Sequence, residues 1–276
     1  EIHALLGENG AGKSTLIKIL GGIYKADAGE IRIDGQPRSI PNARVAADFG
    51  IQIIHQEIIL VPDRTVAANV FLGRELRTPL GTVDAKAMER ETQRVIDDLH
   101  LDLRANQMVR ELTMGMQQLV EIIKVISAEA RIIVMDEPTS SLGEQEVKQL
   151  MATVRKLKSQ GIAILFVSHK LEELFELCDR VTVMRDGEHI LTEDMSNMTN
   201  DRLIQAMVGR SLENQFPKEF GQRGECMLEC RHLKELGVLK DVSFKAYGGE
   251  ILAFAGLVGA GRTETMRALF GADKLD

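Results

Sequence analysis

The stretch of sequence that decides the fold is Gly7-Glu8-Asn9-Gly10-Ala11-Gly12-Lys13-Ser14. It fits the pattern G-x-x-x-x-G-K-[ST] and lies between an apolar strand expected at residues 2–6 and a helix expected from Lys13. The glycines let the backbone curl so that successive N–H groups face one phosphate, and the helix start adds positive potential. A chance match occurs about once per hundred chains of this length. The stretch therefore predicts a phosphate-binding loop, in which Lys13 reaches the terminal phosphates and Ser14 offers a hydroxyl to Mg²⁺.

The composition is that of an ordinary folded protein. The chain has 276 residues, of which 44% are hydrophobic, and this is ample for a core. Its net charge of −7 argues against a nucleic-acid-binding surface, which is usually basic. Three cysteines without a secretory segment argue for a reducing cytosol. The longest apolar run, residues 251–261, is shorter than the roughly 18 residues of a membrane span. These features exclude a transporter pore, a disordered tail and a disulfide-rich secreted domain.

The beginning of the chain is repeated near its end. Residues 1–24 align without gaps on residues 250–273, with nine of the 24 positions identical. The offset of 249 residues is too long for a solenoid repeat and indicates two copies of a whole domain in tandem. Since residue 1 is Glu and both ends carry a phosphate-loop pattern, we expect a segment of a longer polypeptide. It would hold most of copy one and the opening of copy two.

Between the two loops, strand and helix patterns alternate. Continuous apolar runs at residues 132–135 and 162–167 are typical of strands buried on both faces of a parallel sheet. Periodic apolar positions predict three helices, at residues 13–20, 83–99 and 117–127. Further short strands are expected at residues 31–33, 181–184, 189–191, 226–231 and 242–247. This order predicts the α/β class, with the phosphate loop on a central sheet.

An acidic pair follows one of the buried strands. Asp136 and Glu137 come directly after the strand at residues 132–135. Asp136 can hold Mg²⁺ through water there, and Glu137 can orient and deprotonate an attacking water. Acids at strand ends are common, so this interpretation depends on the phosphate loop upstream. Together the two motifs predict a nucleotide-hydrolysing site.

Four further motifs give the sequence a family resemblance. They are Gln56 in IHQE, LTMGMQQ at residues 112–118, DEPTSSL at residues 136–142 and His169 in FVSHK. With these motifs in this order, the chain resembles the ATPase subunits of ABC transporters over essentially its whole length. Two other features, MVGR at residues 207–210 before Phe216-Pro217 and an Arg in the second loop, make it most similar to tandem-domain sugar importers. These are the importers of the ribose, galactose and xylose type.

The resemblance implies a domain organisation. The first nucleotide-binding domain would span residues 1–195, with a P-loop NTPase core sheet of the RecA type and an antiparallel β part at about 1–75 and 129–195. A helical subdomain would be inserted at about residues 76–128. A linker at 196–224 would lead to the start of a second, degenerate domain at 225–276.

The resemblance also implies roles for individual residues. Lys13, Gln56, Glu137 and His169 would be catalytic, with His169 contacting the γ-phosphate. Three residues would serve Mg²⁺, namely Ser14, Gln56 and Asp136. The residues that would contact ATP are Gly7, Glu8, Asn9, Gly10, Ala11, Gly12, Lys13, Ser14, Thr15, Leu112, Thr113, Gly115 and Gln117. Residues 141–143 would form a loop that communicates between the two sites.

The stretch at residues 112–118 is expected to serve ATP held by the opposite domain. Gly115 and the helix start would present backbone N–H groups to its γ-phosphate, so that ATP is sandwiched between the domains. Met114 and Met116 replace a Gly and a Gln that are frequent in the family. These departures affect side-chain contacts and spare the backbone donors.

The second loop departs further from the motif. It has Arg262 where copy one has Lys13, and a planar guanidinium is not equivalent to an ammonium in a crowded loop. Thr263 retains a hydroxyl. Our hypothesis is that the second site binds nucleotide weakly or does not hydrolyse it.

The cysteines are interpreted as structural residues. Alternation would put Cys226, Cys230 and His232 on one face of a strand, but their spacing fits no usual zinc motif. Cys178 follows a helix pattern and is expected in the core.

As a whole, the resemblance implies a Mg²⁺-dependent ATPase that powers monosaccharide import. It would act through transmembrane permease subunits, receive sugar indirectly from an extracytoplasmic binding protein, and bind no nucleic acid. It would lie on the cytoplasmic face of the cell membrane, held by protein contacts. The alternatives are a soluble ABC ATPase of translation or DNA repair, an importer ATPase for a nucleoside or another solute, and a non-catalytic module that holds permease subunits.

Overall fold

The computed structural model describes residues 1–209, 223–235, 237–256 and 259–272. The chain divides into two compact units, Glu1–Glu213 and Asn214–Asp276. Much of the expected linker, with Arg210 and the Phe216-Pro217 motif, lies outside the described residues, as do Leu257 and Val258 of the second loop.

The first unit alternates strands and helices along the chain. Its strands are β1 (Ile2–Leu6), β2 (Ile31–Ile33), β3 (Gln36–Arg38), β4 (Ile51–Ile54), β5 (Ile132–Asp136), β6 (Ala163–Val167), β7 (Arg180–Arg185) and β8 (Glu188–Asp194). Its α-helices are α1 (Lys13–Leu20), α2 (Ala43–Asp48), α3 (Val66–Val70), α4 (Ala85–Leu99), α5 (Met114–Ile126), α6 (Glu144–Ser159), α7 (Leu171–Leu177) and α8 (Asn200–Val208).

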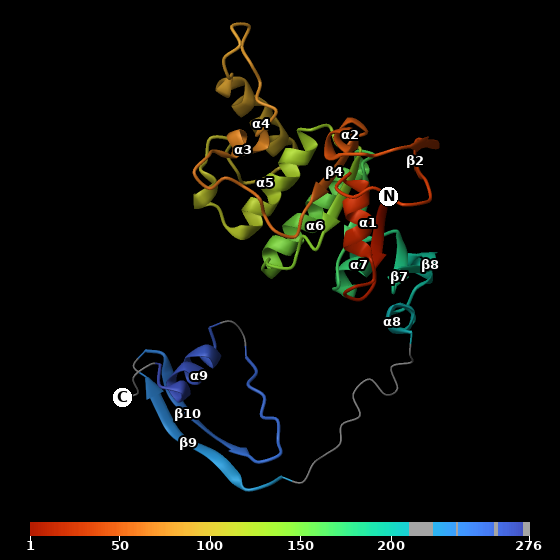
Figure 1. Cartoon of the computed structure of the whole chain (residues 1–276). Coiled ribbons are helices and arrows are strands. Elements are labelled where there is room, and N and C mark those ends of the chain that lie inside the picture. The colour runs from red at the N-terminus through yellow and green to blue at the C-terminus, as the bar shows by residue number, and fades with distance from the viewer. Residues whose placement is uncertain (210–222, 236, 257–258, 273–276) are drawn as a thin grey trace. The chain divides into compact units, whose positions relative to one another are not determined.

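Six of these strands form one mixed sheet in the order β4-β5-β6-β1-β7-β8 (Figure 1). Neighbours from β4 to β7 pair in parallel, and β8 returns antiparallel to β7. The strand β1 lies in the middle, with Ile2 opposite Ile164 of β6 and His3 opposite Arg180 of β7. The predicted α/β class is confirmed.

Alternate residues of the central strands face opposite sides of this sheet. On one side, Leu5 of β1 and Val134 of β5 are buried in a cluster with Ile17 of α1. On the other side, Met135 and Phe166 belong to the main core, where neither is exposed. Both faces are therefore covered, which explains why these strands are continuously apolar in sequence.

A helical layer is formed by α3, α4 and α5, which pack against one another (Figure 1). The helix α5 also contacts α6 and β4, so this layer is joined to the sheet through α5. The short α3 belongs to the layer although it precedes residue 76.

Two helices begin directly after capping residues and not at the predicted positions. Helix α4 begins at Ala85 because Asp84 accepts a hydrogen bond from the Ala87 N–H at 2.9 Å. Helix α5 begins at Met114, before the predicted start at residue 117, because Thr113 is its N-cap. Capping side chains satisfy backbone N–H groups that lack a partner at a helix start.

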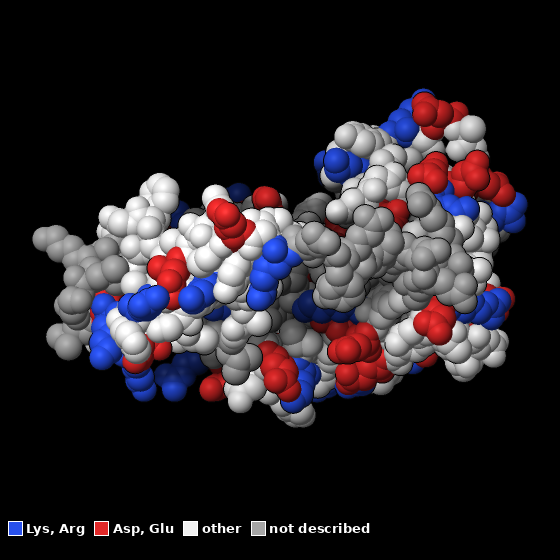
Figure 2. All heavy atoms as spheres, turned by 90° about the horizontal axis from the view of Figure 1, so that it is seen from below, with Lys and Arg blue, Asp and Glu red and all other residues white. Residues whose placement is uncertain are grey.

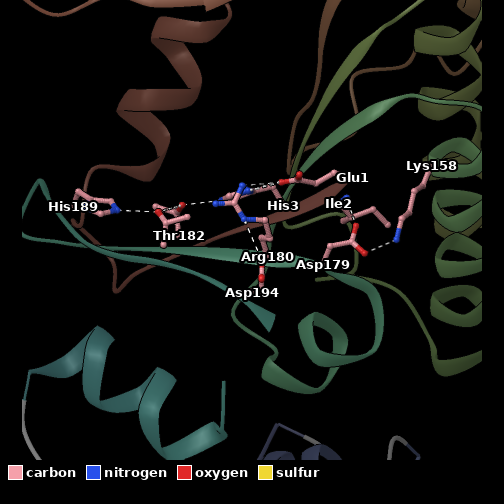
Figure 3. A network of polar contacts seen from close by, with 10 residues as sticks. Glu1, Ile2, His3, Lys158, Asp179, Arg180, Thr182, His189 and Asp194 are labelled. Atoms are coloured by element: carbon pink, nitrogen blue, oxygen red, sulfur yellow. Dashed lines mark hydrogen bonds and ion pairs between the residues drawn. The ribbon is translucent and has the colours of Figure 1, made fainter. Parts of the chain in front are cut away.

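A polar network anchors the amino end of β1 to its neighbours (Figure 3). The Ile2 N–H donates to Asp179 at 2.8 Å, and Asp179 also accepts from Lys158 of α6. His3 lies 2.7 Å from the Thr182 hydroxyl of β7. These contacts fix β1 at the end opposite the phosphate loop, so that the loop extends from a rigid strand.

The second unit contains an antiparallel ribbon of β9 (Cys226–Glu235) and β10 (Leu239–Tyr247), followed by α9 (Arg262–Phe270). Residues 251–255, which correspond to β1 by the repeat, are not in a strand, and Ile251 is fully exposed. In the first unit β1 is held by β6 and β7, which come more than 150 residues later in the chain.

The expected shared face of Cys226, Cys230 and His232 is wrong. His232 has a φ of 51° beside an irregular register in the ribbon, which breaks the alternation. Cys226 is exposed, and Cys230 is buried. No group of three His, Cys, Asp or Glu residues in the described ranges could hold a metal ion. Cys178 is buried as expected.

Charges of both signs are mixed on the described part of the face shown in Figure 2. None of the helices within the described ranges is both long and apolar enough to cross a bilayer.

Candidate functional site

A polar cleft lies at the carboxyl ends of β1, β4, β5 and β6. It consists of two adjoining hollows of about 420 and 270 Å³ that share Asn9, Lys13, Gln56 and Glu137. The first is also lined by Gly7, Ser168 and His169, and the second by Gly10, Ala11, Gly12, Ser14, Thr15 and Asp136. The structure therefore brings the phosphate loop and the acidic pair into one cleft, although they are more than 120 residues apart in sequence.

The phosphate loop requires glycine at two of its positions. A Cβ on Gly7 would lie 2.3 Å from the Met184 carbonyl oxygen, which no side chain tolerates. Gly12 has a φ of 97° and precedes α1 without any side-chain cap, whereas Thr113 and Asp84 cap α5 and α4. The first N–H groups of α1 thus remain open to an anion in the cleft.

The Lys13 ammonium bonds the backbone of its own loop. It donates to the carbonyl oxygens of Gly7 at 2.7 Å and Glu8 at 3.0 Å. Among the predicted loop residues, Glu8 lines neither hollow and contributes only its carbonyl. The ammonium is held at the mouth of the loop, where an incoming phosphate can replace the carbonyls as its partner.

Glu137 is the meeting point of three separate loops. Its Oε2 accepts from Gln56 Nε2 at 3.4 Å, and its Oε1 lies 3.3 Å from His169 Nδ1. Its backbone has a φ of 48° and its N–H donates to the Val167 carbonyl at 2.9 Å. Such a conformation costs about 1 kcal/mol or more in a non-glycine residue and occurs often at functional sites. It aims the carboxylate at the cleft.

Asp136 differs from Glu137 in its surroundings. Burial raises the pKa of its carboxyl, the negative charge of Glu137 raises it further, and His55 and Lys13 oppose the shift. A cation beside this half-buried carboxylate would offset both the effect of burial and the repulsion from Glu137. Ser14, Gln56 and Asp136 supply oxygen donors, and all three line the second hollow. Hard oxygen donors of this kind fit Mg²⁺.

The predicted ATP contacts at residues 112–117 lie elsewhere. They surround the start of α5 in the helical layer and line neither hollow of this cleft. Gln117 donates through Nε2 to the Leu112 carbonyl at 3.1 Å, so this side chain serves the local backbone. Residues 112–117 therefore take no part in the lining of the Lys13 cleft.

Sequence reasoning missed two carboxylates next to the predicted motifs. Glu173 is buried beside the loop that carries His169, and Glu146 lies on the start of α5. Both contact residues more than 30 positions away or on other elements, and their own sequence surroundings resemble ordinary helix faces. No local signal distinguishes them.

The second loop repeats part of this geometry. Gly259 and Gly261 have φ values of 83° and 84°, close to 89° for Gly10 and 97° for Gly12. Helix α9 also begins after glycine without a side-chain cap. The backbone resemblance extends to the described part of the second loop.

A family model provides the assignment. The model described as ABC transporter matches residues 1–140. The chain belongs to the ABC transporter family. Residues 7–14 and most of the acidic motif, which together build the cleft, fall within this match.

Curated relatives within the ABC transporter family extend over the whole chain. The ribose import ATP-binding protein RbsA 1 of Streptomyces coelicolor is 48% identical over 276 residues, covering 100% of this chain and 55% of that protein. The ribose import ATP-binding protein RbsA of Bacillus subtilis is 43% identical, with coverage of 100% and 56%. The chain spans about half the length of the curated relatives it matches.

Solved structures confirm the ATP-binding cassette fold. A nucleotide-free cassette of an ABC transporter has a TM-score of 0.64 at 23% identity, covering 76% of this chain and 85% of that one. A cassette in a post-hydrolysis state with ADP and Pi has a TM-score of 0.60 at 24% identity, covering 72% and 87%.

Proposed function

We propose that this chain is the ATP-hydrolysing part of an importer for ribose or a related monosaccharide. The observation that supports it most strongly is the cleft that joins the phosphate loop to Glu137. The choice of ribose as the substrate is based on relatives that are 42–49% identical and are described as ribose import proteins.

Triphosphate binding would use groups that are already aimed at the cleft. Lys13 would exchange its two carbonyl acceptors for oxygens of the β- and γ-phosphates, and the uncapped start of α1 would donate N–H groups to the same anion. Both interactions hold the triphosphate with its terminal phosphorus toward Glu137.

Hydrolysis would begin with a water held by Glu137. The carboxylate takes a proton from this water as its oxygen attacks the γ-phosphorus, and the bond to the bridging oxygen of ADP breaks. His169 and Gln56 flank Glu137 at 3.3 and 3.4 Å and would orient the water and the transferred phosphoryl group. ADP and inorganic phosphate then leave.

A divalent cation fits beside this reaction. Ser14, Gln56 and Asp136 would hold Mg²⁺, which when bound offsets negative charge on the phosphates. The raised pKa of the Asp136 carboxyl indicates that its negative charge is not fully stabilised by its surroundings, and a cation would supply that stabilisation. Asp136 is therefore a better ligand for the cation than Glu137, which already lies near His169.

The remaining parts of the proposal concern the full-length protein. Unit Asn214–Asp276 would open a second, degenerate cassette, as the repeated loop with Arg262 suggests. Transmembrane permease subunits would hold both cassettes at the cytoplasmic face of the membrane, and an extracytoplasmic binding protein would supply the sugar.

Transport by the full-length protein tests the function. Assembled with its permease subunits in liposomes, it should accumulate radiolabelled ribose only with ATP and Mg²⁺, and more strongly than galactose, xylose or a nucleoside. Accumulation of another solute would show that the proposed substrate is wrong, while the proposed ATPase activity would stand. ATP hydrolysis without uptake, with ribosomes or DNA recovered in pull-downs, would favour a soluble ABC ATPase instead.

Glu173 is proposed to position His169. Its Oε2 accepts from the Thr139 hydroxyl at 2.7 Å and from the Ser168 hydroxyl at 3.0 Å, and its Oε1 lies 3.1 Å from Lys170 Nζ. This buried carboxylate thus ties the loop after β5 to the loop after β6. It touches neither Glu137 nor the phosphate loop.

Replacing Glu173 with Ala leaves the Thr139 and Ser168 hydroxyls without this acceptor and removes the ion pair of Lys170, which keeps its bond to the Thr139 carbonyl. We expect kcat for ATP hydrolysis to fall roughly tenfold with KM for ATP unchanged, and unfolding to cost about 1–3 kcal/mol less. The exposed neighbour Glu172→Ala is the control. An unchanged kcat in a destabilised Glu173→Ala variant would show that the network serves stability alone.

A further inference from the structure

One carboxylate occupies the donors at the start of α5. Glu146 lies in the first turn of α6, and its Oε1 accepts from the Thr113 hydroxyl at 2.8 Å and from the Gly115 N–H at 3.1 Å. Its Oε2 accepts from the Gly143 N–H at 3.0 Å. A single side chain therefore joins the starts of two helices.

The contact with α5 is close. A Cβ on Gly115 would lie 2.4 Å from Glu146 Cδ and 2.5 Å from its Oε1, so a larger residue at position 115 would displace the carboxylate. The Gly143 N–H and the Thr113 hydroxyl hold the pKa of the Glu146 carboxyl below its usual value, with the Gly115 N–H adding to the effect. The group is therefore an anion at neutral pH.

Helix capping explains only half of this arrangement. The bond from the Gly143 N–H to Oε2 is the normal reach of a third-position Glu to its own helix start. The bonds from Thr113 and Gly115 to Oε1 connect to a different helix more than 30 residues earlier. These two bonds need a separate explanation.

Thr113 and Gly115 are both among the residues that the family resemblance places against ATP. The Gly115 N–H is the donor expected to serve the γ-phosphate of ATP on the opposite cassette. A carboxylate oxygen and a phosphate oxygen accept the same hydrogen bonds, and both are anionic. One hydroxyl proton and one N–H cannot serve both acceptors fully, and two anions at this short separation repel each other.

We propose that Glu146 is an internal competitor of the γ-phosphate, holding the start of α5 until ATP on the opposite cassette displaces its Oε1. This inference rests on the proposed function and adds a regulating residue to it. Displacement does not uncap α6, because Oε2 can keep the Gly143 N–H while Oε1 rotates away. The carboxylate thus sets how much ATP is needed before the cassettes close.

Two variants of the full-length protein test this competition. Glu146→Gln keeps the size and one acceptor oxygen without the charge, and Glu146→Ala removes the acceptor. The matched control is Glu144→Ala, because Glu144 lies in the same first turn, is exposed and, among the residues that the structure describes, bonds Lys148 on its own helix. KM for ATP and kcat are measured in each, and ADP affinity is measured by calorimetry.

We expect Glu146→Gln to lower KM for ATP roughly threefold to tenfold, the effect of removing one charged hydrogen-bond competitor. ADP affinity should stay unchanged because ADP has no γ-phosphate, and Glu144→Ala should match the wild type. An unchanged or raised KM in Glu146→Gln would overturn the proposal and leave Glu146 as a helix cap. A lower KM for ATP in Glu146→Gln with an equal gain in ADP affinity would also overturn the proposal, because that effect would not depend on the γ-phosphate. Absence of ATP hydrolysis in the wild type would instead count against the proposed function itself.

Discussion

Replacing Glu137 with Gln is expected to lower steady-state ATP hydrolysis by the full-length protein about 10²- to 10⁴-fold, the usual contribution of a general base. Glutamine has nearly the same shape but cannot take a proton from water at neutral pH. ATP binding should persist, since the phosphate loop follows β1 and Glu137 follows β5. The measurement compares the hydrolysis rate with the ATP dissociation constant.

The choice of Glu137 over Asp136 follows from their neighbours. Glu137 reaches Gln56 and His169 from a strained backbone position, and these side chains can orient a water against it. Asp136 is half-buried with a raised pKa, which suits a carboxylate that lies beside a cation. The two adjacent carboxylates thus have different environments and different proposed tasks.

A matched exposed carboxylate provides the control for this experiment. Glu172→Gln on α7 removes the same charge from the protein away from the cleft and should hydrolyse ATP at the wild-type rate. If Glu137→Gln also hydrolyses ATP at that rate, the assignment of the base is wrong. Thermal unfolding of both variants shows whether a loss of activity comes from a loss of fold.

The cleft could be predicted from sequence because each of its parts is a local pattern. The glycine turn before Lys13 and the acidic pair after an apolar strand both depend on a few consecutive residues. Parallel strands then bring their carboxyl ends to one edge, so the loops after β1, β5 and β6 meet without further information. The helix starts are predicted less accurately, because the prediction uses the spacing of apolar residues and the capping residues Thr113 and Asp84 are polar.

The long-range contacts could not be predicted in this way. Glu146 reaches Thr113 and Glu173 reaches Thr139, each more than 30 residues away, and nothing within a few residues of either carboxylate indicates that partner. The exposed Ile251 shows the same limit, because the copy of an apolar strand sequence forms a strand only where neighbouring strands accept its hydrogen bonds. The motifs thus indicate which residues carry out the chemistry, while the tertiary fold determines which other residues position them.

Replacing Lys13 with Ala is expected to remove measurable ATP binding at the first site. The loss of charge-assisted hydrogen bonds should raise the ATP dissociation constant by roughly 10²-fold or more. The Lys13 ammonium holds two loop carbonyls at 2.7 and 3.0 Å, so the variant loses a cation at the one point where a triphosphate would enter. Calorimetry of the full-length protein should show one ATP site fewer than in the wild type. The control Lys18→Ala removes an exposed lysine from the same helix.

The variant Lys13→Arg separates charge from shape in the same loop. It keeps the positive charge but places a planar guanidinium where the second copy has Arg262. The Lys13 ammonium lies within 2.7 and 3.0 Å of the Gly7 and Glu8 carbonyl oxygens, and a broader guanidinium cannot take the same position between them. We therefore expect Lys13→Arg to bind ATP more weakly than the wild type, which would also explain a weak second site. Undiminished ATP affinity in Lys13→Ala would contradict the phosphate-loop argument, and full affinity in Lys13→Arg would remove Arg262 as a reason to call the second loop degenerate.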